Sequence, residues 1–327
     1  MKISYNQVMK DIYKKEKKPF NIFLIISKIF LYVPMAVLLE KYCIENKVSP
    51  AVLLKTNPAF SFSGLICAKT EIFKKFLKKR KNARFFAVME KIEAKNPTKL
   101  RLKKLLKFIK HKRLKYPLII KPDKGFAGVG LALVKNENHL IRAVSSIEED
   151  YVLQEYSNWP YQMAVFFIRN PGEKQGRIWS LTRIRFLNDA DKSPKLIVPS
   201  TKRLYTDESR RITPALERVF NDISGISGFY FGRFDIKVKN ISAFVKKGKG
   251  FKILEVNAGP NAIALQAFDK KYSIIKRYSI LNDQLVYAFN IARKNARHLS
   301  HSRLDREFKD FWTRYKEFLK QALRKGG

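Results

Sequence analysis

The stretches GRFDIKV (Gly232–Val238) and FKILEVN (Phe251–Asn257) decide the fold class of this chain. In the first stretch, the charged residues Arg233, Asp235 and Lys237 alternate with apolar residues. Successive side chains of a β-strand point to opposite faces of a sheet. The alternation therefore predicts a strand with one charged face and one face in the core.

The second stretch repeats the pattern, because Glu255 and Asn257 share a face while Leu254 and Val256 pack beneath. Pairing the two strands would bring Asp235, Glu255 and Asn257 together. Two carboxylates and an amide oxygen suit Mg²⁺ bound with nucleotide phosphates. Arg233, on the same face, could neutralise charge on a transferring phosphoryl group. The alternative is a surface sheet with scattered charges; the buried apolar face and the following glycine-proline turn argue against it.

A glycine-rich loop lies upstream in YPLIIKPDKGFAGVGLALV, Tyr116 to Val134. Gly125, Gly128 and Gly130 let the backbone approach a phosphate closely, and their N–H groups can form an anion site. Lys121 would add a point charge. GFAGVG is neither a P-loop nor the dinucleotide-binding G-x-G-x-x-G, because a second strand follows it. We predict a hairpin lid over a nucleotide, with an ordinary hairpin as the alternative.

These stretches occur in the order IIKPDKGFAGVG, VLQEY, GRFDIKV and ILEVNAGPN, over about residues 112–270. In this order and spacing they resemble the ATP-grasp superfamily, and within it the D-alanine–D-alanine ligase-like carboxylate–amine ligases. The resemblance implies an α+β, ATP-grasp fold in which two α+β subdomains hold ATP between them. It also implies ATP and Mg²⁺ as cofactors.

The resemblance assigns a role to each matching residue. Lys121 would reach the α/β phosphates, and the loop Gly125, Phe126, Ala127, Gly128 and Gly130 would cover the β/γ phosphates. The adenine would be read by the backbone around Glu155 and Tyr156, with Gln154 beside them. Arg233 would stabilise the acyl-phosphate step, so Arg233 and Lys121 are the expected catalytic residues. The implied metal ligands are Asp235, Glu255 and Asn257.

The chain also departs from the family pattern. Gln162 stands where the family usually has a ribose-binding glutamate, and an amide can still hydrogen-bond a hydroxyl. The segment after the metal strand, AGPNAIALQAF, lacks the usual proline-glycine substrate turn. The upstream lysine that helps to hold the nucleotide cannot be assigned from the sequence, and the N-terminal region is too short, apolar and basic for a D-alanine-binding domain.

We divide the chain into a basic N-terminal region (1–110), an ATP-grasp domain (111–295) and a basic amphipathic C-terminal helix (296–327). The N-terminal region contains an apolar helix at 21–39, interrupted by Lys28 and Pro34, and a lysine-rich helical connector at 72–115. A helix is predicted at ITPALERVFNDIS, with Thr213 as its cap and Pro214 in its first turn. A lysine- and glycine-rich turn is expected between GRFDIKV and FKILEVN.

The formal net charge of +39 favours anionic partners, although compositional bias explains part of it. The two cysteines suggest no disulfide framework, which favours a reducing compartment, and we expect a cytoplasmic protein. Peripheral contact with an anionic membrane through 21–39 is left open, and binding to nucleic acid is less favoured.

The predicted activity is ATP-dependent ligation: a carboxylate is activated as an acyl phosphate and then attacked by an amine. Arg183, Arg185 and Lys202 could bind the acceptor or close over the phosphates, although a solvated basic loop is the simpler interpretation of each. One alternative is an ATP-grasp phosphotransferase. Another is a basic nucleic-acid- or membrane-binding protein with a vestigial nucleotide site. The sequence does not identify the carboxylate, the amine or the oligomeric state.

Overall fold

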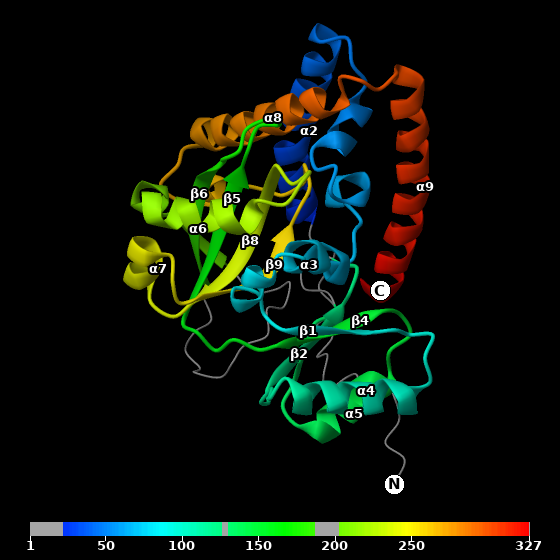
Figure 1. The fold of residues 1–327 in the computed structure, drawn as a ribbon. Helices are drawn as coiled ribbons and strands as arrows, with labels where there is room; N and C mark the ends of the chain where they lie inside the picture. The colour runs from blue at the N-terminus through cyan, green and yellow to red at the C-terminus, as the bar shows by residue number, and fades with distance from the viewer. Residues whose placement is uncertain (1–21, 126–129, 187–202, 327) are drawn as a thin grey trace.

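The computed structural model describes residues 22–125, 130–186 and 203–326. Within them lie two antiparallel sheets surrounded by helices (Figure 1), which confirms the α+β class. The four-stranded sheet has the order β1-β4-β2-β3, and the five-stranded sheet has the order β7-β6-β5-β8-β9. The strands are β1 (Met89–Ile92), β2 (Leu118–Pro122), β3 (Ala132–Val134), β4 (Tyr151–Glu155), β5 (Tyr161–Ile168), β6 (Arg177–Phe186), β7 (Arg203–Asp207), β8 (Phe231–Val238) and β9 (Phe251–Asn257).

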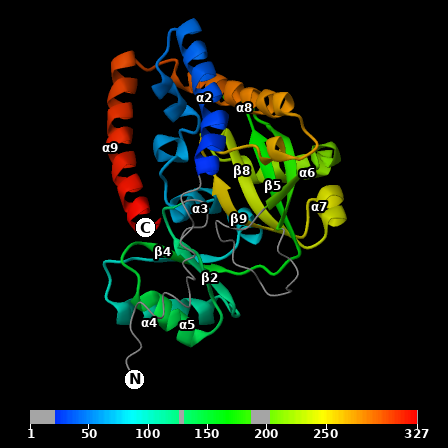
Figure 2. The same cartoon turned by 180° about the vertical axis from the view of Figure 1, so that it is seen from behind.

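The helices cover the sheets on several sides (Figures 1 and 2). The α-helices are α2 (Ile22–Glu45), α3 (Lys69–Leu77), α4 (Thr98–His111), α5 (Glu137–Ser145), α6 (Pro214–Ser224), α7 (Ile241–Lys247), α8 (Ile274–Ala296) and α9 (His301–Gly326). The 3₁₀ turns are η1 (Pro50–Lys55), η2 (Ser61–Gly64), η3 (Arg80–Arg84), η4 (Ser209–Arg211) and η5 (Leu265–Phe268).

The smaller α+β unit is built on the four-stranded sheet. Leu118, Ile120 and Leu153 point from its strands into a core shared with Leu105 of α4 and Leu140 of α5. This core covers one face of the sheet, so the alternate residues of β2 and β4 point to the opposite face, toward the larger unit. The predicted hairpin is present, since β2 and β3 pair antiparallel on either side of the glycine loop.

The larger unit has apolar side chains on both faces of its sheet. On one face, Phe234 and Ile236 of β8 join a core with Phe76 of α3 and Phe220 of α6. On part of the other face, Phe166 and Phe231 pack with residues of α8. The charged residues of β8 therefore lie on the second face, beyond the region that α8 covers.

Two expectations about the connections between strands are wrong. The link between β8 and β9 contains helix α7 rather than a simple turn, because Asn240 caps its first turn and Phe244 is fully buried against the core. The lysine-rich segment 72–115 is not one helical connector, since it contains most of α3 and all of η3, β1 and α4. Strand β1 pairs with β4, and therefore completes the smaller sheet. In contrast, α6 begins as predicted, with the Thr213 side chain accepting a hydrogen bond from Leu216 N.

Helix α2 contains the predicted apolar segment and continues through Pro34 to Glu45. None of the helices in the described parts of the chain has both the length and the apolarity needed to cross a bilayer. Helix α9 runs along one side of the molecule (Figure 1), where Leu304 and Phe311 are buried and Phe308 and Trp312 remain exposed. Part of the apolar face of this amphipathic helix therefore packs against the rest of the molecule, and part remains exposed.

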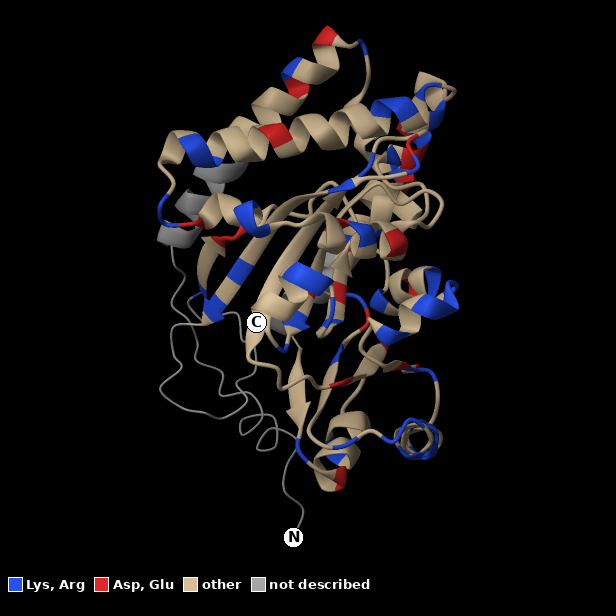
Figure 3. Cartoon of the chain, turned by 60° about the vertical axis from the view of Figure 1, so that its left-hand side comes forward, with Lys and Arg blue, Asp and Glu red and all other residues tan. Residues whose placement is uncertain are grey.

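The basic residues occupy helices, strands and loops on the side of the molecule shown in Figure 3, and do not gather on a single element. Acidic residues are scattered among them at lower density. Contact with a membrane or with nucleic acid remains a prediction.

Candidate functional site

The register of β8 and β9 brings the predicted metal-type residues together. Asp235 lies directly opposite Glu255, and Arg233 lies opposite Asn257. The pairing shifts between Asp235 and Ile236, so that Leu254 is an extra residue on β9. The alternation in the sequence therefore predicted the shared face correctly, but it did not predict the bulge.

The guanidinium of Arg233 is fixed by three hydrogen bonds. Its Nε and one terminal nitrogen donate to the two oxygens of Asp235, at 2.7 and 3.0 Å, and its other terminal nitrogen donates to Ile263 O at 2.9 Å. Burial opposes the charge, but the negative charges of Asp235 and Glu255 outweigh it and raise the pKa of Arg233. Further N–H groups of the fixed guanidinium remain available to an anion.

Glu255 is a half-buried carboxylate that has cations nearby but makes no hydrogen bond or ion pair among the described residues. Burial alone would raise the pKa of this carboxyl, and the charges of Lys121, Lys69 and Arg233 lower it below its usual value. The group is therefore ionised at neutral pH, and its oxygens are free to coordinate a cation.

Lys121 and Gln154 project from the smaller sheet toward the larger one. Both side chains donate to the carbonyl of Leu254, at 3.4 Å for Lys121 Nζ and 3.0 Å for Gln154 Nε2. This carbonyl belongs to the bulged residue of β9. Burial lowers the pKa of Lys121 to about 8, although the negative charge of Glu255 raises it in part. The bulge thus joins the two units beside the candidate phosphate site.

Lys69 is a further cation of the site, and the sequence analysis did not identify it. It is the first residue of α3, and its Nζ donates to Pro122 O and Gly125 O, both at 3.1 Å. Asp123 holds this helix end, because its carboxylate accepts hydrogen bonds from Thr70 N at 2.9 Å and Thr70 Oγ1 at 2.7 Å. Lys69 therefore joins Lys121 and Glu255 from a third element.

A signal for Lys69 existed in the sequence. Ile72, Phe73 and Phe76 have helical spacing, which places Lys69 at the start of a helix. A cation at a helix N-terminus is electrostatically unfavourable unless something compensates it. A lysine at that position therefore indicates an anion or a carbonyl partner nearby, and Lys69 is our candidate for the unassigned upstream lysine.

The glycine loop begins and ends within the described residues. At Gly130 φ is +74°, and a Cβ there would lie 2.7 Å from Pro122 Cγ, so glycine is required by both conformation and space. Gly125 lies beside Lys69 and lines the same cavity as Glu255. Phe126, Ala127 and Gly128 lie outside the described residues, so their predicted contacts with phosphate stay predictions.

The predicted adenine and ribose contacts lie at the other end of the same face. The side chain of Glu155 accepts hydrogen bonds from Val88 N at 3.1 Å and Lys252 Nζ at 3.0 Å. Its backbone N–H donates to Val88 O at 2.8 Å, so this donor is already used, and the predicted reading of adenine by the backbone around Glu155 and Tyr156 stays a prediction. Burial raises the pKa of the adjacent Tyr156. Gln162 Oε1 is buried and has no hydrogen-bond partner in the described structure. A bound hydroxyl would satisfy this oxygen.

The basic residues considered for the acceptor do not lie on this face. Arg183 pairs with Met163, whose side chain lies in the core on the opposite side of the sheet. Arg183 instead packs its guanidinium 5.1 Å from the centre of the Tyr161 ring. Arg185 is two residues further along the same strand and shares the orientation of Arg183. Lys202 lies outside the described residues.

The side chains fit a magnesium ion bound with phosphate. Among the residues of the three described segments, no three His, Cys, Asp or Glu side chains form a cluster that could hold a metal without help. Glu255 has free oxygens, Asp235 keeps lone-pair capacity beside its bonds to Arg233, and Asn257 donates to Asp235 at 2.9 Å through its nitrogen, which leaves its oxygen available. Such an incomplete oxygen set suits Mg²⁺, which usually takes a few protein ligands plus phosphate and water.

No protein-family model and no curated protein sequence matches this chain. Solved structures resemble it. The D-alanine–D-alanine ligase from Bacillus anthracis has a TM-score of 0.46 at 16% identity, over 72% of this chain and 70% of that one. VanG D-Ala:D-Ser ligase from Enterococcus faecalis has a TM-score of 0.44 at 16% identity, and the match covers 68% of this chain and 61% of that one.

The structure of carboxyaminoimidazole ribonucleotide synthase from Aspergillus clavatus, complexed with ATP, has a TM-score of 0.43 at 14% identity. The match covers 64% of this chain and 48% of the synthase, so this chain spans about half the length of that protein. The arrangement of the candidate site described above comes from the chain's own residues.

Proposed function

We propose that this chain is an ATP- and Mg²⁺-dependent carboxylate–amine ligase. The observation that carries the proposal is the joint placement of Arg233, Asp235, Glu255 and Asn257 on paired strands, facing Lys121 and Lys69. Such a set combines cations for phosphate with free oxygens for a metal. The solved structures to which the chain is similar include ligases and a synthase complexed with ATP.

In the proposed reaction, an oxygen of the substrate carboxylate attacks the γ-phosphorus of ATP. The bond from the γ-phosphorus to the bridging oxygen breaks, ADP leaves, and an acyl phosphate forms. The amine nitrogen then attacks the acyl carbon, the carbon–oxygen bond to phosphate breaks, and phosphate leaves while the nitrogen gives a proton to water. Each step needs positioning and charge stabilisation more than a protein nucleophile.

The residues of this chain divide the work between them. Lys69 and Lys121 would hold the phosphates, and Arg233 would stabilise the negative charge on the transferring group. Asp235 keeps Arg233 in one orientation through its paired hydrogen bonds. Asp235, Glu255 and Asn257 would hold Mg²⁺, which when bound screens the phosphate charge.

A covalent mechanism through Cys67 is not supported by its environment. Burial raises the pKa of this thiol to about 11, and its Sγ donates to Ser61 O at 3.3 Å. The thiolate, which is the nucleophilic form, would therefore be scarce at neutral pH. Transfer of the phosphoryl group directly to the substrate is the simpler mechanism for this site.

Trapping with hydroxylamine tests the proposed activity. The chain would be incubated with MgATP and a panel of carboxylates, and hydroxylamine would serve as the amine. Acyl phosphates react with it to give hydroxamates, so hydroxamate and ADP should form together. A stable phosphorylated product without hydroxamate would instead assign the phosphotransferase alternative, and no ADP with any acceptor would overturn the ligase proposal.

A further inference from the structure

A cavity of about 840 Å³ opens from the phosphate end of the candidate site. Glu255, Asn257, Lys69 and Gly125 line it, and so do residues of α2, η1, α8 and α9. A cavity of this size can enclose most of a small organic molecule. Any occupant would lie directly beside the candidate phosphate site.

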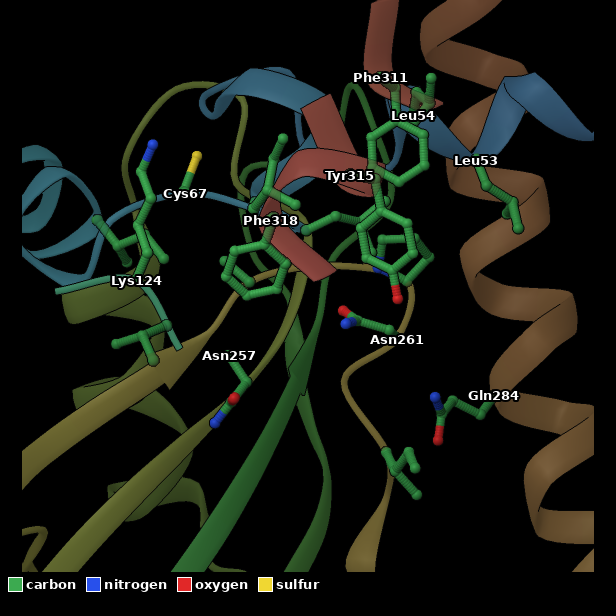
Figure 4. Close-up of a pocket in the computed structure, with 18 of the residues that line it drawn as sticks. Leu53, Leu54, Cys67, Lys124, Asn257, Asn261, Gln284, Phe311, Tyr315 and Phe318 are labelled. Carbon is green, nitrogen blue, oxygen red and sulfur yellow. The ribbon is translucent and has the colours of Figure 1, made fainter. Parts of the chain in front are cut away.

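The walls away from the phosphate end are apolar. They include side chains from five regions of the chain: Leu39, Leu54, Ile263, Leu285, Phe311 and Phe318. In Figure 4, the rings of Phe318 and Tyr315 project from α9 into the space above Asn257 and Asn261. The wall is therefore built by elements that are distant in sequence.

Charge is confined to one end of this cavity. Among the described residues that line it, Lys69, Lys124 and Glu255 are the charged ones, and all three lie near Gly125 or β9. Gln284 is polar, but its amide is already used: its oxygen accepts from Ala264 N at 2.7 Å and its nitrogen donates to Ala262 O at 2.6 Å. The apolar part thus offers little to a polar ligand.

The aromatic wall is held firmly at one end. Leu304 of α9 is buried with residues of α8, Phe311 packs 5.5 Å from the Phe62 ring, and Glu307 forms an ion pair with Lys55. From there, the rings of Phe311, Tyr315 and Phe318 follow one another along the helix at centroid distances of 5.4 and 6.3 Å. They form a continuous surface beside the cavity.

We propose that this cavity holds the apolar body of the carboxylate substrate, an alkyl or aromatic carboxylic acid whose carboxylate lies at the Lys69 and Lys124 end. The inference depends on the proposed ligase function, and it names the substrate class for that site. An amine with an apolar body is the less suitable occupant, because the polar end carries two lysines, Lys69 and Lys124, against one carboxylate, Glu255. A short polar carboxylate would leave the apolar wall in contact with water.

Calorimetric titration of the full chain with acetate, octanoate and dodecanoate tests this inference. Each added methylene that is buried should tighten binding by up to about fourfold. Dodecanoate should bind, octanoate more weakly, and acetate without detectable heat. Affinity that does not depend on chain length would show that charge alone holds the carboxylates, and tighter binding of dodecylamine would assign the cavity to the amine; either result overturns the proposal.

Two pairs of variants locate the binding. Leu285→Trp fills the cavity from α8, and Ile275→Trp on the same helix is its control, because Ile275 is 79% exposed and does not line the cavity. Tyr315→Ala removes part of the α9 wall, and it tests the same cavity if Leu285→Trp fails to fold. Trp312→Ala is its control, because Trp312 is exposed on the same helix and does not line the cavity. Dodecanoate affinity should fall at least about tenfold in Leu285→Trp and severalfold in Tyr315→Ala, with little change in the controls. Equal affinity in Leu285→Trp and Ile275→Trp would place the ligand elsewhere.

Titration of the same proteins with MgATP separates this inference from the proposed function. If MgATP binds and dodecanoate does not, the nucleotide site stands and the substrate class is wrong. If dodecanoate binds in the cavity and MgATP does not bind at all, the ligase proposal fails, and the cavity becomes an apolar ligand site with another role.

Discussion

The phosphate end of the site and the apolar cavity beside it are built in opposite ways. At the phosphate end, Arg233, Asp235, Glu255 and Asn257 stand on two paired strands, and their positions follow from the alternation of a β-strand. In the cavity, the lining residues come from six helical elements that are distant in sequence: α2, η1, η2, α3, α8 and α9. Chemistry that rests on strand spacing can be predicted from sequence, whereas a cavity formed by tertiary packing cannot.

The two regions also contribute in different ways to the proposed function. The strands hold charges in fixed orientations, as shown by the bonds from Arg233 to Asp235 and Ile263. The cavity wall supplies shape and apolar surface. Substitutions at the phosphate end should therefore affect nucleotide binding and chemistry, while those in the wall should affect the choice of carboxylate.

The largest effect is expected at Arg233. Arg233→Lys keeps the charge but loses the paired hydrogen bonds to Asp235, so the turnover number for ADP formation should fall by about 10²-fold or more. Arg183→Lys is the matched control, since Arg183 lies on the same sheet but on its other face. Steady-state assays of both variants, with melting curves to verify folding, would check this. Equal losses in the two variants would show that Arg233 has no special role.

The next largest effect is expected at Lys69, the first residue of α3. Lys69→Met removes one cation from the phosphates, and ATP affinity should fall by about 10- to 100-fold. Lys74→Met is the control, because Lys74 is exposed on the same helix. Calorimetry with ATP measures both, and unchanged affinity in Lys69→Met would remove Lys69 from the nucleotide site.

The lowered pKa of Lys121 gives a prediction about protons. In the free protein this ammonium loses its proton as the pH rises through about 8, because burial disfavours the charge. Phosphate favours the charged form and should raise the pKa, so ATP binding at about pH 8 should take up a fraction of a proton. At about pH 6 the lysine is already protonated, and uptake by this group should vanish.

Calorimetric titrations in buffers with different ionisation enthalpies would measure this uptake. Lys121→Arg should still bind ATP, but without the uptake at about pH 8, because an arginine stays protonated there. If the variant shows the same uptake as the wild type, the proton belongs to another group.

The smallest effect is expected at Gln162. Its buried oxygen lacks a partner in the described structure, and we predict that a ribose hydroxyl provides one. The wild type should prefer ATP over 2′,3′-dideoxy-ATP by about 2- to 10-fold, and Gln162→Leu should lose this preference. Competition binding of the two nucleotides would measure it; a preference that persists in the variant would place the ribose elsewhere.

Much of the α+β fold and most of the charged site could be predicted from sequence. The alternation in β8 and β9 fixed which residues share a face, and Thr213 correctly marked the start of α6. The bulge at Leu254 could not be predicted, because it depends on the register between two strands. Helix α7 was missed because it is short, and its burial against the core stabilises it.

Other features depend on contacts between distant segments. Lys69 belongs to the site because Asp123 holds the end of α3, an interaction across 53 residues. The sequence also gave no way to place Arg183, since a β-strand with basic residues does not show which of its faces is covered by helices. The aromatic face of α9 was visible in the sequence, but not the cavity that it borders.

The central claim is that Glu255 helps to hold a metal ion with the phosphates of ATP. Its most direct test is calorimetric titration with ATP, with and without Mg²⁺, on the wild type, Glu255→Gln and the control Glu173→Gln, which alters an exposed loop carboxylate. We predict that Mg²⁺ tightens ATP binding in the wild type and in Glu173→Gln, and that Glu255→Gln loses about 10- to 100-fold of the affinity for MgATP. Equal affinity of Glu255→Gln and the wild type for MgATP, or no binding of ATP by the wild type, would contradict the claim.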